Sequence, residues 1–97
     1  MSHYHQETVV HAIIPSRERP TRHVVARSGE YPRAVFCPEQ DRTLESTFHR
    51  IGRELGFAAL SVDRREPNIN ADDFVYRAKK VPEAILPPDF EWKTIEE

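Results

Sequence analysis

The sequence predicts a small α+β domain with an antiparallel sheet of two or three strands, one main amphipathic helix and a shorter second helix. Short β-branched runs near the N-terminus are bounded by prolines, glycine and polar turns, which is typical of strands. In the middle of the chain, apolar residues recur every three or four positions, which indicates a helix with one buried face. The length of 97 residues suits one unit, so residues 1–97 are expected to form a single domain.

Three strands are predicted in the first part of the chain. Thr8–Ile14 is rich in valine and isoleucine and ends at a proline. Arg22–Ala26 is centred on two valines, and the turn signal Ser28-Gly29 follows it. Arg33–Cys37 comes directly after another proline and is the third candidate. Short polar turns between these segments favour an antiparallel meander.

The main helix is predicted from about Pro38 to Leu55. Proline is suited to the first helical position, and Gly56 is suited to the position just after the end of a helix. The apolar face consists of four large residues at spacings of four, three and four: Leu44, Phe48, Ile51 and Leu55.

The second helix is predicted over residues 71–80, with Asn70 as its N-cap. Its apolar stripe would consist of Phe74, Val75 and Ala78. Residues 57–62 fit either a short buried strand or the first turn of another helix, and residues 64–70 are expected to form a loop.

Charge and composition narrow the classes of function. The net charge of −2 argues against binding nucleic acid through bulk charge, so direct nucleic-acid binding is not expected. Residues 1–36 hold five arginines against three glutamates, whereas residues 37–97 hold nine basic against thirteen acidic residues. This asymmetry favours a protein partner with complementary charge. No apolar run approaches the roughly 20 residues of a membrane span, and a single cysteine suits a reducing compartment, so the cytosol of a host cell is the expected location.

Two groups of residues have side chains suited to metal binding or catalysis. His3, His5 and Glu7 alternate and could face one metal ion, but a polar chain terminus explains them better, so no metal site is expected. Cys37 precedes the predicted helix, whose dipole would lower the pKa of a thiol, and His49 could act as its base. A small buried hydrophobic residue is the better interpretation of this cysteine. We therefore expect a protein without catalytic residues or a cofactor, and an enzyme using Cys37 ranks third.

Residues 43–66 resemble the first helix and turn of a helix-turn-helix motif. Gly52 lies four residues before Gly56, as a small residue does before the glycine of that turn. The pattern departs at Arg65, where an apolar residue would seat the recognition helix, and at Pro67, which would shorten it. A DNA-binding regulator is thus an alternative, with three residues as DNA contacts: Arg53, Arg64 and Arg65.

Two segments have the composition of contact surfaces. The first is a proline-bounded basic loop whose candidate contacts are Arg17, Arg19, Arg22 and Arg27. The second is residues 83–97, which either pack back onto the core or form an extended acidic and apolar C-terminal arm. Its large apolar residues are Ile85, Leu86, Phe90 and Trp92, of which the last three are the predicted contacts.

The eight prolines affect folding. If each bond before proline is about 15% cis in the unfolded chain, only about a quarter of the molecules begin with every such bond trans. Refolding is then expected to show a phase of tens of seconds that a host prolyl isomerase accelerates. The bonds Glu66-Pro67 and Leu86-Pro87 are the expected accessible ones, so this isomerase is a second candidate partner, with Pro67 among the contacts.

Across all 97 residues, the size, mixed charge, thin core and contact segments resemble those of the small accessory proteins of temperate phages. Within that group, the chain is most similar in character to the anti-RecBCD proteins of lambdoid phages. The resemblance implies a non-enzymatic protein that binds a host nuclease and helicase complex, protects linear phage DNA and favours recombination. An anti-CRISPR or other counter-defence inhibitor is an alternative that the same features permit.

Overall fold

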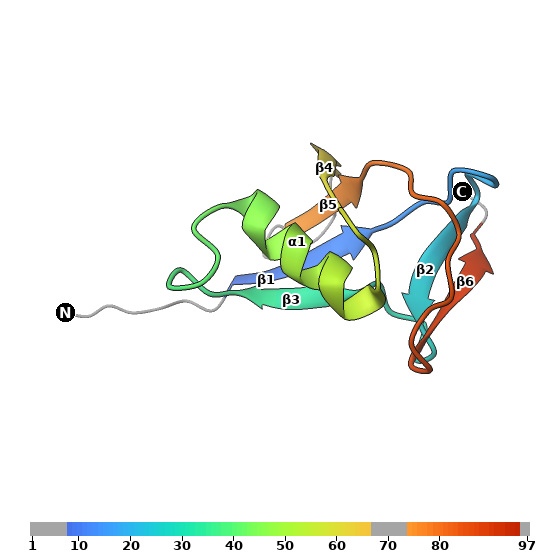
Figure 1. Ribbon diagram of the computed structural model, residues 1–97, viewed down its shortest axis with the longest axis horizontal. Coiled ribbons are helices and arrows are strands. Elements are labelled where there is room, and N and C mark those ends of the chain that lie inside the picture. Colours follow the sequence, from blue (N-terminus) through green and yellow to red (C-terminus); the bar gives the residue numbers. More distant parts are fainter. Residues whose placement is uncertain (1–7, 67–73, 96–97) are drawn as a thin grey trace.

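The computed structural model describes residues 8–66 and 74–95, which form an α+β fold (Figure 1). One helix and six strands are found within these ranges, so the predicted class is confirmed, whereas the predicted numbers of strands and helices are wrong. In chain order the elements are β1 (Thr8–Ile13), β2 (Arg22–Ala26), β3 (Arg33–Phe36), α1 (Leu44–Leu55), β4 (Val62–Arg65), β5 (Phe74–Ala78) and β6 (Phe90–Thr94).

The strands form two sheets rather than a meander. The larger sheet has the order β3-β1-β5-β4, with β1 antiparallel to β3 and parallel to β5, and with β5 antiparallel to β4. The smaller sheet pairs β2 with β6 in antiparallel register, Val24 lying opposite Trp92. β1 and β3, which precede and follow β2 in the sequence, therefore pair with each other. β2 pairs instead with β6, near the C-terminal end of the described residues.

The chain that follows β1 joins the two sheets. Pro15 forms an antiparallel bridge with His23, and Ser16 forms a parallel bridge with Val81. The amide of Val24 donates to the carbonyl of Ile14 over 3.1 Å, and the amide of Val81 donates to the carbonyl of Pro15 over 3.0 Å. The backbone of residues 14–16 thus bonds to β2 on one side and to Val81 on the other, which fixes the small sheet to the end of β1 (Figure 1).

Helix α1 begins later than predicted. The side chain of Thr43 accepts from the amide of Ser46 over 3.2 Å and caps the helix at Leu44. Residues 37–41 instead form a turn, in which the amide of Asp41 donates to the carbonyl of Cys37 over 2.6 Å. The predicted end is confirmed, because Gly56 has a left-handed φ of 88° and its amide bonds back to the last turn.

The core lies between α1 and one face of the larger sheet, which the helix crosses (Figure 1). Phe48, Ile51 and Leu55 of the predicted helical face are buried, and Leu44 packs against them from a half-buried position. The other buried apolar members of the core cluster are Val10, Ala12, Ile14, Val24, Phe57, Leu60, Ala78 and Val81.

The predicted second helix is wrong over its described part. Residues 74–78 form strand β5, which lies between β1 and β4 in the larger sheet. Phe74, Val75 and Tyr76 are aromatic or β-branched, and such residues fit a pleated surface with neighbours on both sides. Asn70 and residues 71–73 lie outside the described residues.

Gly52 has a packing role that the helix-turn-helix pattern did not suggest. A Cβ at this position would lie 2.8 Å from the Cβ of Leu60, in the segment between α1 and β4. Because a Cβ cannot rotate away from its own backbone, the helix and this segment can approach so closely only with glycine between them.

Gly52→Ala is therefore expected to lower the free energy of unfolding, measured by urea denaturation. The overlap costs about 1–3 kcal/mol, which exceeds the gain of up to about 1 kcal/mol from the better helix propensity of alanine. Glu54→Ala is the matched control, because Glu54 is exposed on the same helix and should change stability little. A Gly52→Ala protein as stable as the wild type would contradict the close approach.

Candidate functional site

The basic loop between β1 and β2 is a tightly bonded turn, residues 16–22, called here the arginine turn. The hydroxyl oxygen of Ser16 is fully buried and accepts from the amides of Glu18 and Arg19, each over 3.1 Å. The amide of Arg22 donates to the carbonyl of Arg19 over 2.8 Å and closes the turn. These local bonds fix the backbone from which the arginine side chains project.

Glu83 ties the arginine turn to a segment more than sixty residues later in the chain. Its Oε2 accepts from the Ser16 hydroxyl over 2.8 Å, and its Oε1 accepts from Nη1 of Arg22 over 2.7 Å. Its amide donates to Oε2 of Glu18 over 2.9 Å, and this bond is the main reason that the pKa of Glu18 lies below its ordinary value. Three independent contacts therefore hold the two segments side by side.

Residues 83–89, which begin with Glu83, form the proline segment. Hydrogen bonds to the rest of the fold anchor it at several points along its length. Nε1 of Trp92 donates to the carbonyl of Ala84 over 2.9 Å. The amide of Arg27 donates to the carbonyl of Asp89 over 2.9 Å, and its Nε donates to the carbonyl of Pro88 over 2.5 Å. Between these anchors the side chain of Ile85 is 97% exposed. A large apolar side chain is thus held in solvent on a fixed backbone.

The four arginines predicted as contacts divide into two pairs. Arg22 is bound to Glu83, and Arg27 is bound to the proline segment and lies 3.7 Å from Glu91, so both have structural roles. Arg17 and Arg19 are exposed, and neither side chain makes a hydrogen bond or ion pair with any part of the chain that the structure describes. Of the predicted set, these two remain accessible for a partner.

The three apolar residues predicted as contacts are less exposed than Ile85. Leu86, Phe90 and Trp92 are half-buried and pack against the core, and the ring of Trp92 meets that of Phe57 edge-on at 6.2 Å. Of the two alternatives for residues 83–97, the described part up to residue 95 thus packs back onto the fold and does not extend as an arm. Pro67 lies outside the described residues.

The helix-turn-helix interpretation is wrong for residues 43–66. Residues 57–61 have no helical structure, and residues 62–65 form strand β4, so no recognition helix follows α1 within residues 57–66. Arg53 lies on α1, whereas Arg64 and Arg65 lie on β4, the edge strand of the larger sheet. Two of the three predicted DNA contacts therefore lie on a strand rather than on a helix that could enter the major groove.

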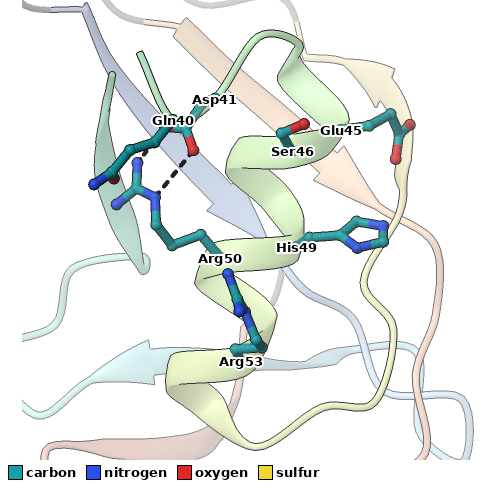
Figure 2. Close-up of a pocket in the computed structure, with 7 residues that line it drawn as sticks. All are labelled: Gln40, Asp41, Glu45, Ser46, His49, Arg50 and Arg53. Atoms are coloured by element: carbon teal, nitrogen blue, oxygen red, sulfur yellow. Dashed lines mark hydrogen bonds and ion pairs between the residues drawn. The ribbon is translucent and has the colours of Figure 1, made fainter. Parts of the chain in front are cut away.

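A cavity of about 630 Å³ lies along the outer side of α1 (Figure 2). Within it, the carboxylate of Asp41 accepts from Nε of Arg50 over 3.1 Å and is also bound by Nη2 of the same guanidinium. This pairing holds the pKa of Asp41 below its usual range and raises that of Arg50. The side chains of His49 and Arg53 line the same open groove.

Cys37 does not lie at the start of α1. The turn of residues 37–41 separates it from the helix, so the dipole argument for a reactive thiol has no structural basis. Its Sγ lies 3.5 Å from the carbonyl of Val35, to which it donates. The cavity of Figure 2 includes His49 but not Cys37.

No group of three histidine, cysteine or acidic side chains among residues 8–66 and 74–95 is arranged to hold a metal ion. His3, His5 and Glu7 lie outside these ranges. The helix in the described part of the chain is too short and polar to cross a bilayer. Comparisons with protein-family models, curated proteins and solved structures found no match to this chain.

Proposed function

We propose that the protein is a non-enzymatic binding protein that contacts a partner protein through Arg17, Arg19 and Ile85. The observation that carries this proposal is the set of contacts made by Glu83, which hold the arginine turn against the proline segment. Arg17 and Arg19 have guanidinium groups with no partner among residues 8–66 and 74–95, and Ile85 is exposed. All three side chains project from backbone that hydrogen bonds already hold in place.

Such a surface suits binding because association is weakened by the entropy of ordering flexible groups. Here the backbone is already ordered by hydrogen bonds, so only the side chains become restricted on binding. Arginine is enriched among residues that dominate binding energy, and its planar fork matches a carboxylate. The partner that fits has an apolar pocket for Ile85 with acidic residues at its rim.

The partner class that we propose is a host DNA-processing nuclease and helicase complex of the RecBCD type. The support is the whole-chain resemblance to small phage accessory proteins, together with the surface described above. The mechanism is occlusion: a bound protein of this size covers a site at which the complex engages linear DNA ends. Linear phage DNA would then survive longer and recombine.

The test is the degradation of linear duplex DNA by a purified RecBCD-type complex, with increasing concentrations of this protein. The wild type is expected to slow degradation in a saturable way. Arg17→Glu with Arg19→Glu, and separately Ile85→Asp, should each raise the concentration needed by at least about tenfold.

The matched control is Arg42→Glu with Arg53→Glu, which makes the same change in net charge at exposed positions away from the arginine turn. This control should act like the wild type. A wild-type protein without effect on the complex would refute the proposed partner. An equal loss in both double variants would refute the proposed surface, because bulk charge would then explain the binding.

A further inference from the structure

One edge of strand β6 pairs with β2, and the other edge pairs with no strand of residues 8–66 and 74–95 (Figure 1). The amide of Ile95, just after β6, donates to the carbonyl of Thr21 over 2.9 Å. With the register of the two strands, this bond places the odd-numbered residues of β6 in the hydrogen-bonded pairs with β2. The even-numbered residues therefore direct their backbone groups away from β2. They are Phe90, Trp92 and Thr94.

Most of these backbone groups are available to a further strand. The amide of Phe90 is used, because it donates to the carbonyl of Pro87 over 3.0 Å. The carbonyl of Trp92 lies 3.5 Å from Nη2 of Arg22, a long contact that leaves one lone pair unused. The amides of Trp92 and Thr94 bond to no atom of the described residues. Unpaired donors thus alternate with carbonyl acceptors along this edge, as the addition of a strand requires.

The outer edges of the large sheet are less suited to pairing. At β3, the carbonyl of Val35 accepts from Nη2 of Arg50 over 2.7 Å and from the thiol of Cys37 over 3.5 Å. At β4, the register with β5 shifts between Val62 and Arg64, which disturbs a regular ladder. A blocked carbonyl and an irregular register both hinder the addition of a strand. Among the described strands, β6 therefore has the edge best suited to it.

We infer that two copies of this chain associate through β6, in antiparallel register, with Trp92 opposite Trp92 of the second copy. In this register Glu91 lies opposite Lys93 of the second copy, and Lys93 lies opposite Glu91. Residues 91 and 93 fall in the non-hydrogen-bonded pairs, in which side chains approach most closely, so each pair brings opposite charges together. The order Glu-Trp-Lys is thus complementary to itself, which selects a second copy over an unrelated strand.

Both charged side chains are accessible for these pairs. Lys93 is exposed and forms no ion pair with residues 8–66 and 74–95. The side chain of Glu91 is 43% exposed, and its contact with Nη1 of Arg27 is 3.7 Å long. A carboxylate has several acceptor sites, so this contact is compatible with a lysine of the second copy. Phe90 and Trp92 pack against the core, so residues 91 and 93 lie on the opposite face of the strand.

The dimer is independent of the proposed nuclease partner, because it uses neither Arg17, Arg19 nor Ile85. Pairing of the two edges would extend the two-stranded sheet across both copies. Five residues from each copy make a smaller interface than a permanent dimer has. Monomer and dimer are therefore expected to exchange, with the dimer favoured as the protein concentration rises.

Sedimentation equilibrium of the whole protein, from micromolar to millimolar concentration, measures this association. The average mass should rise from that of one chain toward that of two. It should not rise further, because a two-fold contact between identical edges closes on itself. A protein that stays monomeric at millimolar concentration, or one that forms an open series of larger species, would refute the inference.

Two charge-reversal variants test the register. Lys93→Glu places only negative charges along this edge, and Glu91→Lys places only positive ones, so each variant alone should associate at least about tenfold more weakly. An equimolar mixture of the two variants should associate as the wild type does, because unlike charges again lie opposite. Lys80→Glu is the matched control for Lys93→Glu, since Lys80 is exposed outside β6, and it should behave as the wild type. Wild-type association of either variant alone, or a mixture that does not associate, would overturn the register.

Thr94→Pro tests the backbone ladder separately from the charges. Proline removes an amide that points away from β2, so the fold should be retained, as for proline on an edge strand in general. Association should be lost, because the two amides of Thr94 would donate to Phe90 carbonyls across the two-fold axis. Unchanged association of a folded Thr94→Pro protein would show that the copies meet through another surface.

Discussion

Replacing Phe48 by alanine is expected to lower the free energy of unfolding by about 3–5 kcal/mol. Phe48 is fully buried at the centre of the face that α1 presents to the sheet, and its ring meets that of Tyr76 edge-on at 6.4 Å. Alanine removes the apolar surface and leaves a cavity that the surrounding strands can fill only in part. Since a domain of this size has a total stability of roughly 5–15 kcal/mol, the loss is a large fraction of the whole.

Urea denaturation followed by far-ultraviolet circular dichroism measures this loss. If Phe48→Ala does not fold at all, Phe48→Leu remains measurable, because a swap of similar volume costs less than about 1.5 kcal/mol. Val35→Ala is the control, since Val35 is apolar but 38% exposed and should lose much less. Equal losses at Phe48 and Val35 would show that α1 is not packed as described.

In strand β5, the spacing of apolar residues alone does not determine the secondary structure. Phe74, Val75 and Ala78 fit a helical stripe, and the same run is equally compatible with a strand. The choice is made by β1 and β4, which supply hydrogen-bonding partners on both sides of residues 74–78. An isolated helix of about ten residues is marginal in water, so this tertiary pairing overrides a weak local preference.

The bounds of the three strands near the N-terminus are predicted to within one residue, whereas their predicted arrangement as a meander is wrong. Arg22–Ala26 is a strand as expected, and it pairs with Phe90–Thr94 rather than with its neighbours in sequence. Short β-branched runs specify an extended backbone locally, whereas the choice of partner depends on contacts between residues far apart in the chain. Trp92 opposite Val24 is one such contact.

At the candidate site, too, the sequence predicts the local features but not the contacts between residues far apart in the chain. Arginines in a proline-bounded loop indicated a contact surface, but the composition could not show that Glu83 neutralises Arg22 and leaves Arg17 and Arg19 exposed. Ile85 and Leu86 are adjacent and similar in hydrophobicity, so only the bonding of the proline segment decides which one faces the core.

Asp41→Asn is expected to lower the free energy of unfolding by about 2–4 kcal/mol at neutral pH. The Asp41 side chain is only 3% exposed and accepts from Arg50 and, over 3.0 Å, from the amide of Cys37. The amide of asparagine removes the charge and places a donor beside a guanidinium group, so Arg50 loses its counter-charge. Arg50 is 24% exposed, so water compensates in part, and the loss is smaller than for a fully buried pair.

The effect of this substitution should depend on pH in a defined direction. Because the folded protein holds the pKa of Asp41 below its ordinary value, the stabilisation is complete above the unfolded pKa of about 3.9 and disappears as the pH falls through the folded pKa. Denaturant titrations from pH 7 downward should therefore show the wild type and Asp41→Asn converging in acid. Glu30→Gln is the control, since its pair with Arg33 is 3.6 Å long and more than half exposed on both sides, and it should cost at most about 1 kcal/mol at neutral pH. A difference between wild type and Asp41→Asn that stays constant down to acid pH would mean that the ionised carboxylate is not the source of the stability.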